Sequence, residues 1–567
     1  MFGLLSMWIS WDLFLFERPA SVAPPWGRLR LVPAERQAVQ AEGQADHEAA
    51  SPAATCVVAD SVFTVRMLIL HGVKRTFSSL LHPLLANKEL HFPGWFKFGA
   101  ATSSYQIEGS WNVSDKAISI WDDYTHTQPH KIKDHSNGDV ACDSYNQYEK
   151  DIEMAEQLGL DFYRFSISWS RLLPEGYRTR ISSDGRQYYD NLINGLLDRG
   201  IEPMVTLYHS EMPKMFQDLG GWANPEMAEW FADYADVAFS LYGDRVKLWI
   251  TINEPSIICD SSAYVLGVVE PFLAPYLCSK TVLMAHAKAY HNYKKNYKPM
   301  YQGKVGIAHA ASYFSAKTQN DAELAELFRQ YHFGLFMHPL HSKSGGWPAT
   351  VVELMKNISS VEGFPRSRLP PLTKHEVEFI RGTNDFLGLN YYTSCTVRKA
   401  KAGEKRQESL GDLPELNAIF EPYPNSTAAY PEYYSSYPEG LRAFIAWFTK
   451  NYGVQDIFIT ENGYTSYTDD LNDFNRITYI EKHLEKILLC IYEDGARIHG
   501  YTYWSLMDNF EWRNGYTAKF GLYDVDFSDE GRKRTPRLSA QYYSYVIKSR
   551  SIDSNKWKSQ MEDTNDN

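Results

Sequence analysis

Short runs of consecutive apolar residues alternate along this chain with longer stretches in which apolar residues recur at the spacing of a helix. The short runs are rich in β-branched and aromatic residues, which is typical of strands buried on both faces. We expect strands at 96–106, 162–169, 203–209, 246–253, 304–310, 386–393, 457–461 and 499–506. We expect amphipathic helices between them, at 145–158, 188–199, 225–242, 281–296, 322–336, 440–451 and 479–493.

This alternation of strands and helices predicts the fold class. Eight strand-and-helix units predict an α/β protein with a single (β/α)8 TIM barrel and long βα loops. A doubly wound open sheet is the alternative. No glycine-rich phosphate loop follows the first run, which disfavours that alternative.

The ends of the chain differ from the barrel region, 91–548. Residues 1–90 form a leader that we expect to be disordered or poorly packed, because 33–60 is rich in Ala, Gln, Glu and Pro. The apolar run at 1–16 contains Asp12 and has no basic residue before it, so it is a weak signal peptide. Residues 549–567 form a polar tail.

Charge and hydropathy exclude several classes of partner. The net charge is −12 and no long basic run occurs, so we expect no nucleic acid partner. No run of 18 apolar residues occurs, so we expect no membrane span. The 15 Trp, 38 Tyr and 29 Phe suit either a large aromatic core or rings that stack on sugars. The sequence predicts no particular oligomeric state.

The cysteines have neither CxxC pairs nor metal-ligand spacing, and we expect no metal and no organic cofactor. Cys259 and Cys278 flank one loop and can form a disulfide in an oxidising compartment. The sequons at Asn112, Asn357 and Asn425 favour a secreted protein, with the cytosol as the alternative location.

Two glutamates occupy similar positions at the ends of predicted strands. Glu254 follows the fourth strand and precedes Pro255, and Glu461 ends the seventh strand shortly before Gly463. A TIM barrel carries its catalytic residues at these strand ends, and paired carboxylates are typical of chemistry on glycosidic bonds. Read singly, each carboxylate could instead cap a helix or lie in water.

An ordered series of motifs covers residues 92–548. Their positions are 98–102, 105–109, 138–145, 163–169, 243–247, 460–463 and 504–512. This series resembles glycoside hydrolase family 1, which includes β-glucosidases and lactase-like and myrosinase-like enzymes, and it is most similar to invertebrate members. The resemblance implies a retaining exo-β-glycosidase that acts on O-linked β-D-glucosides, with galactosides and fucosides as further candidates, and whose partners are the β-glycoside and water.

The resemblance also implies roles for individual residues. Glu254 is similar to the general acid/base and Glu461 to the nucleophile, whose carboxyls lie about 5 to 5.5 Å apart in retaining enzymes. Arg164 and Tyr392 are expected beside the nucleophile. The remaining matches are substrate-binding residues: Asn253 for the sugar 2-hydroxyl, Gln106, His209 and Glu511 for other hydroxyls, Trp504 as the floor and Trp512 as a wall. If the resemblance is set aside, Arg164 is interpreted as a buried ion-pair partner, and His209 and both tryptophans are interpreted as core residues.

Two positions depart from the family pattern. Ser210 stands where a tryptophan usually follows the histidine, which either loosens the sugar pocket or makes room for a bulkier sugar. Tyr433 and Tyr434 are the candidates for a tryptophan that usually stacks on the aglycone. Glu254 is present where plant thioglucosidases have glutamine, which favours O-glycosides.

Two other functions remain open at this point. A catalytically weakened sugar-binding or receptor-partner protein on the same barrel would be expected to lack one catalytic glutamate, and both are present. A transglycosidase would use the same residues with an alcohol in place of water.

Overall fold

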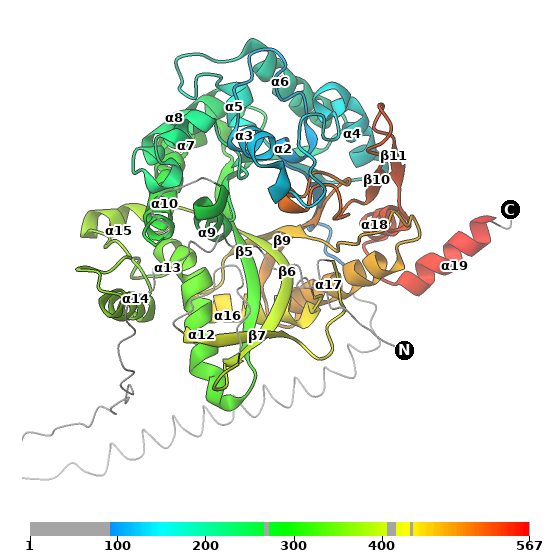
Figure 1. The fold of residues 1–567 in the computed structure, drawn as a ribbon. Coiled ribbons are helices and arrows are strands. Elements are labelled where there is room, and N and C mark those ends of the chain that lie inside the picture. The colour runs from blue at the N-terminus through cyan, green and yellow to red at the C-terminus, as the bar shows by residue number, and fades with distance from the viewer. Residues whose placement is uncertain (1–90, 266–271, 405–415, 431–434, 566–567) are drawn as a thin grey trace, which may run out of the picture. The chain divides into compact units, whose positions relative to one another are not determined.

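The computed structural model describes residues 91–265, 272–404, 416–430 and 435–565 (Figure 1). The predicted leader, 1–90, and the aglycone candidates Tyr433 and Tyr434 lie outside the described residues. The domain boundaries proposed above therefore stay predictions.

Eight parallel strands form a closed barrel, which confirms the predicted (β/α)8 fold. The strands are β1 (Lys97–Ala101), β2 (Phe162–Ser166), β3 (Glu202–Tyr208), β4 (Leu248–Asn253), β5 (Lys304–Ala316), β6 (Phe386–Lys399), β8 (Asp456–Asn462) and β9 (Arg497–Trp504). Each strand pairs with the next in this order, and β9 pairs with β1 to close the ring. All eight predicted strands overlap these elements.

The main helices follow the strands in the expected alternation. They are α4 (Ser144–Leu158), α6 (Ser183–Asp198), α8 (Met227–Tyr242), α10 (Ala274–Asn292), α16 (Pro438–Tyr452), α17 (Phe474–Tyr492) and α18 (Leu538–Ser549), with α12 (Ala322–Arg329), α13 (Leu335–His341), α14 (Ala349–Val361) and α15 (Lys374–Ile380) between β5 and β6. Figure 1 shows such helices arranged around the central strands. Their apolar faces pack against the outward side chains of the barrel in one large core.

Shorter elements lie in the loops and at the end of the chain. They are α2 (Ser104–Ile107), α3 (Ile120–Thr127), α5 (Trp169–Leu172), α7 (Lys214–Asp218), α9 (Pro255–Val265), α11 (Lys298–Tyr301), α19 (Ser554–Asn565) and the strands β7 (Ala418–Pro422), β10 (Tyr523–Val525) and β11 (Arg534–Pro536). Trp557 of α19 is buried and contacts Tyr542 edge to face, so this part of the polar tail packs on the barrel.

The interior of the barrel changes from apolar to charged along the strands. Side chains two residues apart on a strand point to the same side. Phe162 of β2 and Met204 of β3 belong to a buried apolar cluster contributed by six barrel strands. Two residues further along the same strands are Arg164 and Thr206, which are also buried. A polar layer therefore lies above the apolar one, towards the carboxyl ends of the strands.

Four elements differ from the sequence expectation. The first strand ends at Ala101, and Gln106 lies on the short helix α2, where Ser103 Oγ donates to Gln106 Oε1 at 2.6 Å. Strands β5 and β6 are longer than predicted, because they continue together beyond the barrel and β7 pairs antiparallel with β6. The predicted helix 322–336 is interrupted by a π-helical turn at Gln330–Gly334.

Within the described ranges, no helix combines the length and the apolarity that a membrane crossing requires.

Candidate active site

The predicted site residues gather at the carboxyl ends of the barrel strands. Four of them lie in strands: Arg164 in β2, Tyr392 in β6, Glu461 in β8 and Trp504 at the end of β9. His209 directly follows β3, and Asn253 ends β4 with Glu254 directly after it. Gln106 lies on α2, and Glu511 and Trp512 lie in the loop after β9. Residues from six strand ends thus meet in one place.

Glu461 is held by one cation and one phenol. Arg164 Nη1 donates to Glu461 Oε1 at 2.7 Å, and the Tyr392 hydroxyl donates to Glu461 Oε2 at 2.7 Å. Each carboxylate oxygen therefore accepts a hydrogen bond, and one of them is charge-assisted. The carboxylate is buried, so these two donors fix its orientation.

Glu254 lies in a different electrostatic environment. Its Oε1 accepts a hydrogen bond from Asn390 Nδ2 at 3.0 Å, which is a neutral donor. Burial and the charge of Glu461 raise the pKa of the Glu254 carboxyl to about 8, although Asn390 and Arg164 oppose this shift. Glu254 therefore holds a proton at neutral pH, and in this state it can act as an acid.

The Asn253 amide has a fixed orientation. Its Oδ1 accepts from Arg164 Nη2 at 2.7 Å and from Asn390 Nδ2 at 3.0 Å. Two donors on the oxygen leave the Nδ2 group on the opposite side, where it lies 3.3 Å from His209 Nε2. Asn253 therefore presents a hydrogen-bond donor rather than an acceptor on the side of His209.

His209 is packed between two indoles. Its ring stacks on Trp504 with a centroid distance of 5.5 Å and on Trp512 at 6.0 Å, each with an interplanar angle of 16°. Burial and the charge of Arg164 hold the pKa of His209 well below its usual value, so the ring is neutral. Its Nδ1 is buried and has no hydrogen-bond partner among the described residues, which suits a group that meets a ligand hydroxyl.

Gln106 and Glu511 form a second polar pair. Gln106 Nε2 lies 3.3 Å from Glu511 Oε2 and donates to Asn509 Oδ1 at 2.8 Å. Burial and the charge of Glu461 raise the pKa of Glu511 to about 8, while a hydrogen bond from the Trp504 indole opposes the shift. An amide and a carboxyl side by side can bind two neighbouring hydroxyls.

Three site residues have a left-handed backbone. The φ angles are 59° at Ser210, 50° at Glu254 and 51° at Trp512. Side chains other than glycine rarely adopt this region, and such positions cluster at functional sites. The Ser210 carbonyl accepts a hydrogen bond from Trp121 Nε1 at 2.9 Å, and the Trp121 ring lies 4.8 Å from that of Trp512.

A family model for glycosyl hydrolase family 1 matches residues 88–552, a range that contains every strand of the barrel. The chain belongs to glycosyl hydrolase family 1. The resemblance seen in the sequence is thereby confirmed, and the protein is a glycoside hydrolase of the β-glycosidase type.

Individual relatives agree with this assignment. Myrosinase 1 of Brevicoryne brassicae is 42% identical over 464 residues, which cover 80% of this chain and 98% of the relative. The cytosolic beta-glucosidase of Homo sapiens is 36% identical over 82% of this chain and 99% of the relative. A solved structure of an aphid myrosinase superimposes with a TM-score of 0.76 at 41% identity, covering 81% of this chain and 99% of that one.

Asn390 belongs to the candidate site, and the sequence analysis missed it. It contacts both Asn253 and Glu254, and Thr460 Oγ1 donates to its Oδ1 at 2.6 Å, which fixes its amide orientation. The available signal was a polar amide within the strand predicted at 386–393, directly before Tyr391 and Tyr392. In the described part of the chain, no group of three or more His, Cys, Asp or Glu side chains is placed to hold a metal ion.

The protonation of Glu254 gives a testable pH dependence. A proton donor with a pKa of about 8 is competent below that pH and is lost above it. For phenyl β-D-glucoside, whose leaving group needs protonation, we expect kcat/KM to fall about tenfold per pH unit above pH 8.

The substitution Glu254→Gln tests whether Glu254 is the group whose titration causes this fall, the basic limb of the pH profile. With phenyl β-D-glucoside, the kcat/KM of the variant should be low and should no longer fall above pH 8. With 2,4-dinitrophenyl β-D-glucoside, whose phenolate leaves without a proton, the variant should keep most of the wild-type kcat/KM. A variant that retains the same limb would show that another group titrates there.

Proposed function

We propose that this protein is a retaining exo-β-glycosidase that hydrolyses O-linked β-D-glucosides by double displacement, with galactosides and fucosides as further substrates. The observation that supports this most is the asymmetry between two carboxyls. Glu461 is paired with a buried cation, whereas Glu254 has a neutral amide partner and a pKa raised to about 8. One charged and one protonated carboxyl is the state that the first step requires.

In the first step, a Glu461 oxygen attacks the anomeric carbon and forms a glycosyl ester. The bond from that carbon to the glycosidic oxygen breaks, and Glu254 gives its proton to the departing oxygen. The leaving alcohol departs neutral, and Glu254 is left as a carboxylate.

The second step uses the same residues in reversed roles. Esterification removes the charge of Glu461, which is one of the causes that raise the pKa of Glu254. Glu254 therefore stays a carboxylate at neutral pH and accepts a proton from water as the water oxygen attacks the anomeric carbon. The ester bond breaks, and the sugar leaves with its original anomeric configuration. An alcohol in place of water would give transglycosylation.

The surrounding groups suit a glucose ring. Asn253 offers a donor for the 2-hydroxyl, and Gln106 with Glu511 offers both donor and acceptor sites for neighbouring hydroxyls. The faces of Trp504 and Trp512 supply apolar surface for the ring carbons. Because a buried polar group left unpaired is costly, such contacts discriminate strongly between stereoisomers.

Two features support secretion. The sequon side chains Asn112, Asn357 and Asn425 are all exposed, so a glycan on each is compatible with the fold. Cys259 and Cys278 form a disulfide, and such bonds persist in oxidising compartments. We therefore place the protein in the secretory route.

The nucleophile is tested by Glu461→Gln. We expect turnover of every aryl β-D-glycoside in a glucoside, galactoside, fucoside and thioglucoside panel to fall by at least roughly 10⁴-fold, because the amide cannot form the glycosyl ester. The exposed Glu378→Gln on α15 is the control and should be fully active. Substantial activity in Glu461→Gln would refute the assignment, and an α-configured initial product in the NMR spectrum of the wild-type reaction would refute retention.

Ser210 is tested by Ser210→Trp. The family tryptophan would narrow the pocket beside His209, so we expect KM or kcat for unmodified glucosides to change several-fold, with Ser210→Ala close to wild type. If steady-state kinetics show both constants unchanged, Ser210 lies outside the sugar pocket.

Secretion is tested by expressing the full chain in insect cells. We expect secreted protein whose mobility increases after enzymatic N-glycan removal, and no shift in a variant with all three sequon asparagines changed to Gln. Protein that stays in the cytosol, unglycosylated and with Cys259 and Cys278 as thiols, would contradict the placement.

A further inference from the structure

The segment that carries Asn253 and Glu254 is an irregular part of the barrel. The pairing register between β4 and β5 shifts between Ile250 and Asn253, and Glu254 has a φ of 50°. A β-bulge of this kind re-aims the side chains that follow it. Here it turns Asn253 into the barrel although Thr251, two residues earlier, faces the helix layer.

Helix α10 contacts the residues just before Asn253 and Glu254 through a buried histidine. His286 Nδ1 lies 2.7 Å from Thr251 Oγ1, and His286 Nε2 lies 2.6 Å from the Thr383 carbonyl. Burial lowers the pKa of His286 to about 4, so the ring is neutral and carries one proton. The carbonyl can only accept, which places that proton on Nε2 and makes Thr251 the donor to Nδ1.

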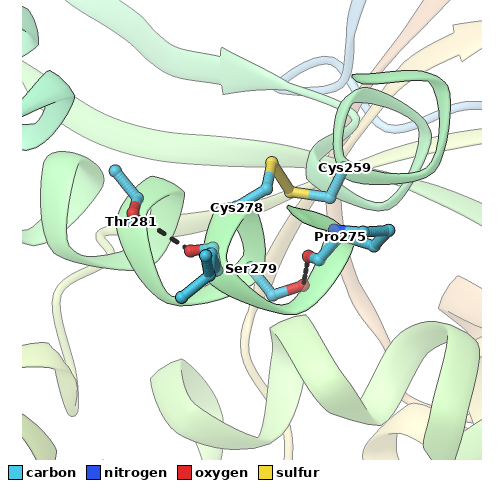
Figure 2. Close-up of a disulfide and its surroundings, with 6 residues drawn as sticks. Cys259, Pro275, Cys278, Ser279 and Thr281 are labelled. Atoms are coloured by element: carbon cyan, nitrogen blue, oxygen red, sulfur yellow. Dashed lines mark hydrogen bonds between the residues drawn. A yellow bond between two sulfur atoms is a disulfide. The ribbon is translucent and has the colours of Figure 1, made fainter. Parts of the chain in front are cut away.

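The same helix is joined by a disulfide to the residues that follow Glu254 in the chain. The Glu254 carbonyl accepts hydrogen bonds from the amides of Ile257 and Ile258 at 3.0 Å each, so it starts helix α9. Cys259 follows in that helix and is bonded to Cys278 of α10, with a Cα–Cα distance of 5.3 Å (Figure 2). Both cysteines are buried.

The two contacts are therefore on either side of the catalytic dipeptide and belong to one helix. Cys278 and His286 lie eight residues apart in the sequence, about 12 Å along the axis of α10. We propose that these contacts form a positioning brace, the α10 brace, made of Thr251–His286 and Cys259–Cys278, which holds Glu254 where it can protonate the leaving group. The inference rests on the acid/base role proposed for Glu254.

A disulfide that only stabilises the folded state would have different effects. It would raise the free energy of unfolding without affecting any chemical step selectively. A positioning brace affects the step in which Glu254 transfers a proton, because proton transfer needs the donor within hydrogen-bonding distance of the leaving oxygen. The dependence of the rate on the leaving group separates the two roles.

The test compares two substrates in the double variant Cys259→Ser/Cys278→Ser. We expect kcat/KM for phenyl β-D-glucoside to fall about tenfold more than kcat/KM for 2,4-dinitrophenyl β-D-glucoside, with KM little changed. Thr251→Val, which removes the hydroxyl donor and keeps the shape, should give a selective loss in the same direction. Assays are run well below the melting temperature of each variant.

The control is Cys490→Ala, which removes a buried thiol from α17 and leaves the α10 brace intact. It should lower the melting temperature with no leaving-group selectivity. Equal losses for both substrates in the double variant, or a lower melting temperature with unchanged kinetics, would overturn the α10 brace. If Glu254→Gln itself shows no leaving-group selectivity, the proposed acid/base role fails instead, so the two failures are distinguishable.

Discussion

The site depends on one buried cation, the guanidinium of Arg164. It donates to Glu461, Asn253, Thr206 Oγ1 and the Thr460 carbonyl, and so it links the ends of β2, β3, β4 and β8. Its side chain is 0% exposed. A charge buried this deeply is tolerated because a carboxylate and three neutral acceptors replace its water. The same contacts fix the orientation of the proposed nucleophile and of the Asn253 amide.

That cation also acts on the carboxyls around it. Glu254, Glu461 and Glu511 affect one another electrostatically, and Arg164 contacts Glu461 alone among them. Burial is the largest cause that raises the pKa of Glu254 and of Glu511, and the charge of Glu461 adds to it, so that each pKa is raised to about 8. The pairing of Arg164 with Glu461, together with the burial of the other two carboxyls, thus supports the different roles proposed for Glu461 and Glu254.

Much of this arrangement can be predicted from local sequence patterns, and the rest depends on contacts between strands. Buried parallel strands have a continuous apolar pattern, so the eight strands and the glutamates at their ends were predictable. The role of Asn390 was not, because it depends on the register with which β6 pairs with β5 and β8 and on contacts across the barrel end to Asn253 and Glu254. The strand expected to reach Gln106 ended five residues earlier, where the hydroxyls of Thr102, Ser103 and Ser104 interrupt the apolar run. Sequence spacing alone does not determine the pairing of Cys259 with Cys278, since it does not show which faces two helices present to each other.

The structure explains how the position after His209 can hold a serine while the proposed catalytic pair is unchanged. The turn at Ser210 is held through its backbone, because Trp121 Nε1 donates to the Ser210 carbonyl. The next residue, Glu211, is buried and accepts hydrogen bonds from the hydroxyls of Ser168 and Ser170. Neither contact involves the side chain at position 210, so that side chain can vary without moving the turn. Since the Trp121 ring also packs against Trp512, the turn and Trp512 are connected independently of the side chain at position 210. The side chain at position 210 can therefore change without disturbing the hydrogen bonds that hold Glu254 and Glu461.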